Sequence, residues 1–314
     1  MDYRQCAVLV LMSAGVCNVV MAEAGVSTAL ELGYRVDNLS WNIASDTTGQ
    51  TTPNVLSELS WSNLVIPQAR FKFEGHGDNE VHLFGSVAYG RMRSGDNQDS
   101  DYILDNRQGE FSRSNNRAGG NVADGSLGVG VTLLKSSDDG RIMSLMPIAG
   151  YSLHRQNLTM TDGNQTIDML NDPPNLGTIP GLDSSYDARW QGGWLGFRLM
   201  EDDVPRGLRV GFDIAYHKIQ YRAEANWNLR TSFAHPKSFD HHAEGNGWTA
   251  SLNAAARLTS NLDWLIGLDY GAWIASNGVD TVYPSDSTLL PQATRLNEVS
   301  WESLAINMGL ALRF

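Results

Sequence analysis

Apolar and polar residues alternate along most of this sequence, which is the period expected of β-strands. The final segment is the clearest case, because one face is continuously apolar while the other is small, polar or basic. The apolar face consists of Leu304, Ile306, Met308, Leu310, Leu312 and Phe314. The second face consists of Ala305, Asn307, Gly309, Ala311 and Arg313. The pattern predicts a strand with one surface in an apolar environment and one facing a polar interior.

The same period recurs upstream, in segments 127–133, 208–217, 248–258 and 264–271. In each segment the second face is small, polar or charged, as in the wall of a transmembrane barrel with a wet or hydrogen-bonded lumen. A β-sandwich is the alternative, but it would have to bury this polar face in a second packed core. The sequence therefore predicts an all-β fold that closes on itself.

The connections between these segments fall into two lengths. Four are short and rich in turn residues: 75–79, 136–141, 201–206 and 259–262. Five are long and polar: 37–53, 93–117, 157–185, 226–240 and 276–297. Nine connections join ten strands, so we predict a ten-stranded antiparallel transmembrane β-barrel. Short turns should face the periplasm and long loops the cell exterior, with the barrel in a bacterial outer membrane.

Aromatic residues near the predicted strand ends fit the girdles that barrels place at the membrane interface. They are Tyr34, Trp61, Tyr89, Trp248 and Trp264. The chain also ends on the aromatic Phe314, as bacterial outer-membrane barrels commonly do.

The N-terminus has the features of a secretory signal peptide. Arg4 gives a weakly basic start, residues 7–20 are mostly apolar, and residues 22–24 read Ala-Glu-Ala, a small-x-small cleavage pattern. We therefore expect a signal peptide over 1–24 and a barrel over 25–314. Both cysteines, Cys6 and Cys17, lie in the first part, so a disulfide or a Cys-ligated metal is excluded from the mature protein.

The chain is acidic. Its formal charge is 23 − 35 = −12, and removing residues 1–24 changes this to 22 − 33 = −11. Such a chain repels phosphates, which excludes a nucleic-acid partner, and it attracts cationic ligands.

The stretch 95–102 carries the most suggestive chemistry, reading Gly-Asp-Asn-Gln-Asp-Ser-Asp-Tyr. In an extended segment the side chains of Asp99 and Asp101 point the same way, about 7 Å apart. Two such carboxylates can orient a water and take its proton, or can hold a basic side chain. A solvated acidic loop or a loose cation site is the plainer interpretation.

This stretch, after the third of ten strands, resembles the omptin family of outer-membrane proteases. Residues 56–61 are similar to the family's second strand, Gly150-Tyr151 to its fifth, and 186–196 to its sixth. The resemblance implies surface endopeptidase activity that cuts between basic residues, with catalytic roles for Asp99 and Asp101. It also implies a need for lipopolysaccharide, with Tyr151, Arg155 and Arg189 at the contact positions, but no other cofactor and no metal. Leu153 stands where the family has a Glu.

The family's second catalytic half-site is an Asp-x-His pair at the outer end of the seventh strand. The matching region, 224–230, reads Glu-Ala-Asn-Trp-Asn-Leu-Arg and contains no such pair. Without its His, a site of this kind loses general-base help worth on the order of 10² to 10⁴ in rate.

Asp240 and His242, on the returning strand, are a candidate relocated dyad. Strand parity counted from Trp248 places even-numbered residues on the lipid-facing side, although a bulge above the membrane could reverse this. A metal site at His241 and His242 is disfavoured, because adjacent strand residues point to opposite faces. His154 and His217 fall on strand bodies and are interpreted as lumen or interface residues.

Two functions remain open. The first is an omptin-type endopeptidase with an altered second half-site, acting on basic peptides. The second is a non-proteolytic barrel that serves as an adhesin, a binder of cationic ligands or a structural membrane protein. In both cases the partners are outer-membrane lipid and lipopolysaccharide. A diffusion porin is less favoured, since about ten strands leave a lumen that side chains fill.

Overall fold

The computed structural model describes residues 25–77 and 80–314, so the predicted signal peptide lies outside the described residues. The described chain is built from strands, and no helix in it is long and apolar enough to span a bilayer. The strands are β1 (Gly25–Ile43), β2 (Ser57–His76), β3 (Val81–Arg91), β4 (Ser94–Leu104), β5 (Gln108–Val131), β6 (Leu134–Asp138), β7 (Arg141–Asp168), β8 (Gly177–Asp203), β9 (Leu208–Asn226), β10 (Phe239–Arg257), β11 (Leu262–Val282) and β12 (Gln292–Arg313).

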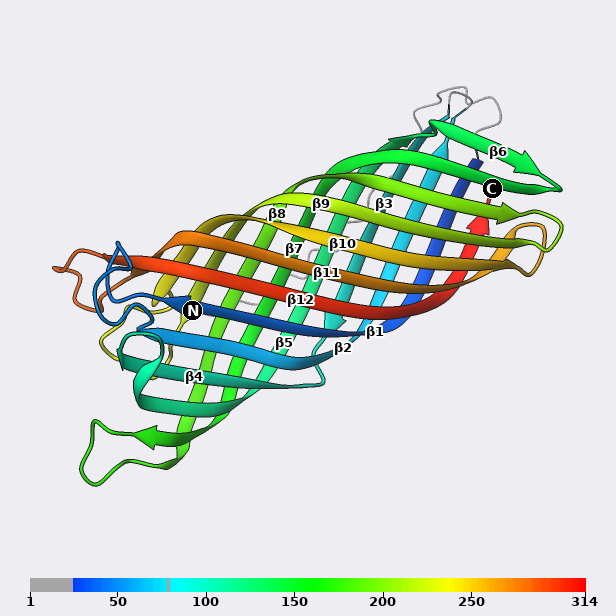
Figure 1. Cartoon of the computed structure of the whole chain (residues 1–314). Coiled ribbons are helices and arrows are strands. Elements are labelled where there is room, and N and C mark those ends of the chain that lie inside the picture. The colour runs from blue at the N-terminus through cyan, green and yellow to red at the C-terminus, as the bar shows by residue number, and fades with distance from the viewer. Residues whose placement is uncertain (1–24, 78–79) are drawn as a thin grey trace.

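These strands form a closed antiparallel ring, which confirms the predicted ten-stranded barrel (Figure 1). β3 and β4 are two parts of one wall strand, because both pair with β2 and β5. β5 and β6 likewise both pair with β7. The ring closes where β12 pairs with β1, for example Leu312 with Thr28. Closure satisfies the backbone hydrogen bonds of every wall strand within lipid.

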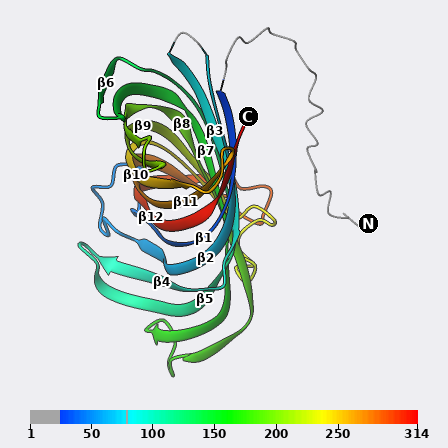
Figure 2. The same cartoon turned by 90° about the vertical axis from the view of Figure 1, so that its right-hand side faces the viewer.

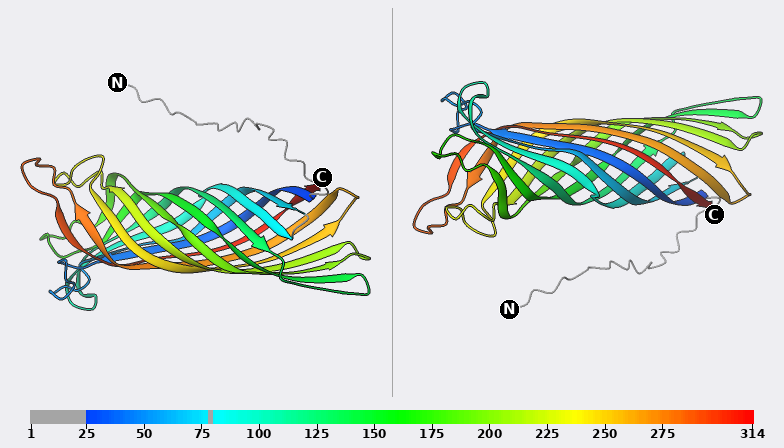
Figure 3. Two further views of the ribbon diagram at one scale, coloured as in Figure 1. Left: turned by 90° about the horizontal axis from the view of Figure 1, so that it is seen from above. Right: turned by 90° about the horizontal axis from the view of Figure 1, so that it is seen from below.

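The two ends of the barrel differ. The C-terminus and the short turns lie at one end, here called the turn end, and the long connections lie at the other, the loop end (Figure 3). Much of the polar sequence expected as loop is strand that extends the wall. Residues 94–117 form β4 and the start of β5 around a turn at 105–107, and this hairpin and the β7–β8 hairpin project at the loop end (Figure 2).

The outward face of the wall is an apolar belt, as the alternation predicts. Leu304, Ile306, Met308, Leu310 and Leu312 of β12 are all exposed on the outer surface. Four of the five predicted girdle aromatics also face outward: Tyr34, Tyr89, Trp248 and Trp264.

The fifth girdle residue was placed wrongly, since Trp61 points into the lumen and is only 1% exposed. The cause is an irregularity of β2 at Asn63, which has a left-handed φ of 53° and shifts the register of β2 against both β1 and β4. Leu64 and Ile66 face inward on one side of this bulge, and Leu59 and Trp61 face inward on the other. A single extra residue thus reverses the parity of the strand.

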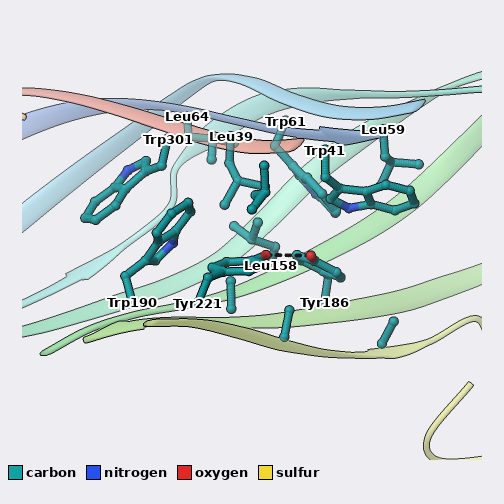
Figure 4. Close-up of a cluster of buried hydrophobic side chains, with 14 of the residues drawn as sticks. Leu39, Trp41, Leu59, Trp61, Leu64, Leu158, Tyr186, Trp190, Tyr221 and Trp301 are labelled. Atoms are coloured by element: carbon teal, nitrogen blue, oxygen red, sulfur yellow. Dashed lines mark hydrogen bonds between the residues drawn. The ribbon is translucent and has the colours of Figure 1, made fainter. Parts of the chain in front are cut away.

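The lumen is divided into two halves with different contents. At the loop end it is filled by a hydrophobic core of large aromatic side chains from both walls (Figure 4). Trp61 stacks on Tyr186 with ring centroids 5.1 Å apart, and Trp273 stacks on Trp301 at 4.1 Å. Toward the turn end the lumen holds paired charges, such as Arg70 with Asp269 at 2.6 Å. The hydrogen-bonded lumen expected from the alternation is therefore found only toward the turn end, where ion pairs lie beside a smaller apolar cluster.

We predict that Trp61→Ala lowers the free energy of unfolding by about 3–5 kcal/mol, because a fully buried indole leaves a cavity. Urea unfolding in lipid vesicles, followed by the gel mobility of the folded barrel, measures the loss. Trp248→Ala is the matched control, since Trp248 is 53% exposed on the outer surface and should cost much less. Equal losses in the two variants would contradict the assignment of Trp61 to the core.

Candidate functional site

The structure places Asp99 and Asp101 together on β4, on the wall of the loop end. Asp99 is the cross-strand neighbour of Leu59, and Asp101 that of Ser57. Leu59 is fully buried in the aromatic core, so the two carboxylates share its inward face, and both are half-buried.

Burial and neighbouring negative charge disfavour the ionisation of these carboxylates. Burial, together with the neighbouring charge of Asp101, raises the pKa of Asp99 to about 8, against a smaller opposing effect of Arg230. Burial also raises the pKa of Asp101, opposed by Ser57 and Arg230. The pair therefore retains a proton at neutral pH and is poised to release it when a cation approaches.

The region that matches the family's second half-site offers no base. Asn228 accepts hydrogen bonds from the backbone N–H of Asp183 and the hydroxyl of Ser184, both at 3.0 Å. Asn226 lies 2.7 Å from His235. Arg230, in the loop between β9 and β10, supplies the positive charge that acts on the Asp pair. These side chains order the loop, and a cation stands where the resemblance implies a base.

Asp240 and His242 lie 3.5 Å apart, but in different surroundings. Asp240 is buried and accepts a hydrogen bond from the Tyr283 hydroxyl at 2.7 Å. Although burial raises the pKa of Asp240, its contacts with Lys237 and Tyr283 hold that pKa below the usual range. The His242 side chain is 49% exposed and lies on the outward-facing parity of β10. This pair does not face Asp99.

The inward-facing histidine of this segment is His241, which the sequence suggested only as half of a disfavoured metal site. Its Nδ1 lies 2.8 Å from the Tyr186 hydroxyl, which in turn lies 2.5 Å from the Tyr221 hydroxyl. Its Nε2 lies 3.2 Å from an Asp280 oxygen. The contact of Nδ1 with Tyr186 is a hydrogen bond, whereas Nε2 is close to Asp280 without the alignment of a hydrogen bond. The strand alternation that places His242 outside also places His241 inside. The inward position of His241 could therefore have been predicted from the sequence.

Asp280 reaches His241 because of a bulge in β11. Between His242 and Glu244 the register of β10 against β11 shifts by one residue, with the extra residue at Asn277 (φ 56°). β10 pairs with β9 without a shift, so its own parity is unchanged. Trp273 and Ala275 face inward on the turn side of this bulge, and Asp280 faces inward beyond it.

Core side chains separate His241 from the Asp pair. His241 is fully buried, and its ring lies 4.8 Å from that of Trp41. Trp41 neighbours Leu59 across the strands, and Leu59 neighbours Asp99. The imidazole is thus packed behind an apolar layer.

The residues implied as lipopolysaccharide contacts lie on the outer surface. Arg155 and Arg189 are cross-strand neighbours on β7 and β8, and Arg222 of β9 extends the row. Tyr151 lies exposed on β7, nearer the apolar belt. Adjacent arginines repel one another unless an anion is shared. Arg222 was not predicted as a contact residue, although the even-numbered residues of 208–216 face outward and Arg222 continues that series.

Within residues 25–77 and 80–314 no cluster of three or more His, Cys, Asp or Glu side chains is arranged to hold a metal ion.

A closed ring of antiparallel strands with an apolar outer belt defines an outer-membrane β-barrel. The chain belongs to the family described as Pom, Protochlamydia outer membrane protein, whose model matches residues 29–314. Its location is accordingly the bacterial outer membrane. No curated protein sequence matches the chain.

Among solved structures, the chain is similar to the outer membrane protease OmpT from Escherichia coli, with a TM-score of 0.71 and 13% identity over 92% of this chain and 97% of that chain. The translocator domain of the autotransporter NalP from Neisseria meningitidis matches with a TM-score of 0.39 and 11% identity, over 93% and 89% of the chains. At 13% identity the likeness to the protease is one of fold.

We predict that the Asp99–Asp101 pair makes the protein less stable as pH rises. The folded pKa of Asp99 exceeds the unfolded value, so the native state binds more protons, and stability falls between about pH 4 and about pH 8. Urea unfolding across this range should give a flatter pH profile for Asp99→Asn than for the wild type. Parallel profiles would show that the pair ionises normally.

Proposed function

We propose that this protein is a non-proteolytic, omptin-like surface barrel that binds basic peptide segments at its loop end. The ligand's Arg or Lys side chain sits against Asp99 and Asp101, and lipopolysaccharide surrounds the barrel at the Arg155–Arg189–Arg222 row.

Binding of a cation is supported by the electrostatics of the Asp pair. The raised pKa values of these two half-buried carboxylates mean that the pair holds a proton at neutral pH in the absence of a ligand. An arriving ammonium or guanidinium favours the ionised form and forms charge-assisted hydrogen bonds. Arg230, which already acts on both carboxylates from an exposed loop position, is an internal example of the charge that the pair attracts.

The observation that carries the non-proteolytic assignment is the burial of His241. Water attack in the omptin manner needs an imidazole that faces the Asp pair across the cleft. Here the inward imidazole is fully buried, with both ring nitrogens close to Tyr186 and Asp280. The exposed imidazole, His242, lies on the opposite face of its strand.

Lipopolysaccharide association is supported by the arginine row and its position. Three arginines in adjacent register form a basic row, beside which Asp187 supplies one negative charge, and guanidinium groups bind phosphate bidentately. Tyr151, between the row and the apolar belt, suits the boundary between headgroup and acyl chains.

We predict that the wild-type barrel binds a fluorescent Ala-Arg-Arg-Ala peptide and leaves it intact. Asp99→Asn and Asp101→Asn should each weaken binding about tenfold or more, since a charged hydrogen bond contributes about 1.5–3 kcal/mol. Affinity should rise with pH, because binding of a cation releases the proton held by the pair. Fluorescence anisotropy measures the affinity, and mass spectrometry of the peptide detects cleavage.

Asp96→Asn is the matched control, because Asp96 is exposed on the same strand and this substitution removes the same charge. Equal weakening of peptide binding in all three variants would show that only the net charge of the barrel matters. If the wild type hydrolyses the peptide and Asp99→Asn does not, the protein is an endopeptidase and the proposed binding function is wrong.

We predict that Arg189→Ala weakens lipopolysaccharide binding about tenfold, from the loss of one charge-assisted contact. The measurement is the rise in unfolding temperature on titration with lipopolysaccharide. Arg206→Ala, at the turn end, is the control and should leave the titration unchanged. If the unfolding temperature of Arg189→Ala rises with lipopolysaccharide as that of the wild type does, the lipid contact lies elsewhere.

A further inference from the structure

The lumen between the aromatic core and the turn end contains a cavity of about 410 Å³. Its lining extends from Trp301 and Trp273, on the side of the aromatic core, to Ser27 and Arg313 near the turn end. The volume lies within the range of small-molecule sites, which run from about 300 to 1,000 Å³.

The cavity owes its width to glycines in the wall. Trp194 lies so close to Gly128 and Gly150 that a Cβ on either would approach its indole within 2.5 Å. Trp273 lies in the same way against Gly247 and Gly271, at 2.1 and 2.2 Å from the ideal Cβ positions. Because the wall lacks these side chains, the two indoles lie against it and leave the centre of the lumen open.

The end of the cavity beside the core is mainly aromatic, and its charged side chains are paired. Arg35 lies over the Trp301 ring at 5.2 Å and pairs with Asp124, which also contacts His154. Trp273 stacks on Trp301 at a ring distance of 4.1 Å, and Trp190 packs on Trp301 at 5.9 Å, which continues the layer into the core. Phe84 and Ile148 complete the apolar lining beside Trp194. This layer closes the cavity toward the loop end.

The charged side chains that line the rest of the cavity are paired with one another. Arg198 donates two hydrogen bonds to Asp213, at 2.8 and 2.9 Å. Lys72 lies 2.9 Å from Glu31, and Arg313 lies 2.9 Å from Asp263. A ligand entering from the turn end therefore meets polar groups but no uncompensated charge of either sign.

We propose that this cavity is a binding chamber for one small uncharged amphiphile, which enters from the turn end with its apolar part first. The apolar part packs between Trp194, Trp273 and Phe84, and a hydrogen-bonding head remains among the ion pairs. This site is separate from the Asp99–Asp101 pair and does not depend on the function proposed for that pair.

The test is isothermal titration calorimetry with n-hexyl-β-D-glucoside, using the barrel held in an amphipol. We expect saturable binding of one molecule per barrel, and weaker binding of hexyl sulfate and hexyltrimethylammonium. Ala255→Phe should weaken the glucoside about tenfold, because Ala255 lines the cavity between Arg209 and Leu265.

Ala250→Phe is the matched control on the same strand. Ala250 neighbours the outward-facing Ile214, so the added ring enters the apolar belt and should leave affinity unchanged. Gly128→Ala, which pushes Trp194 and Phe84 into the cavity, is a second variant should Ala255→Phe fail to fold. The proposal would be overturned if uptake of the glucoside were not saturable, or if the charged probes bound as tightly as the glucoside. It would also be overturned if a folded Ala255→Phe or Gly128→Ala variant bound the glucoside as tightly as Ala250→Phe does.

Discussion

Within a bilayer every backbone N–H and C=O needs a partner, and the ring that closes between β1 and β12 supplies all of them. The remaining features follow from this closure. Ten strands set a fixed lumen width, and the side chains must fill it or line it. Paired ions and an aromatic-walled cavity occupy one half, and stacked tryptophans and tyrosines occupy the other.

Beyond the bilayer the constraint relaxes, and irregular backbone becomes tolerable because water can satisfy it. The loop end accordingly has bulges on left-handed Asn63, Asp162 and Asn277. Asn and Asp adopt this conformation more readily than other non-glycine residues. The barrel thus combines a regular belt that anchors it with an irregular mouth whose chemistry can diverge.

This division explains what could be predicted from the sequence. The strand number follows from the count of short and long connections. The lipid-facing side of β12 and the shared face of Asp99 and Asp101 follow from unbroken alternation. Trp61 and Asp280 could not be placed, because each lies beyond a bulge that reverses parity. His241 was open to prediction from the parity of β10, but the Asp-x-His spacing drew attention to Asp240 and His242 instead. The aromatic core was hidden for a related reason, since its residues alternate like a lipid-facing girdle.

The bulge at Asn277 makes the meeting of His241 and Asp280 a matter of chain length as well as residue identity. If the same residues of β11 were paired regularly at this point, without the bulge, the acid would face outward and Val279 inward, although neither side chain had changed. A bulge of this size appears in an alignment only as a one-residue gap. In barrels of this kind, such a gap near the mouth therefore marks a point where the residues that face the lumen change from one parity to the other.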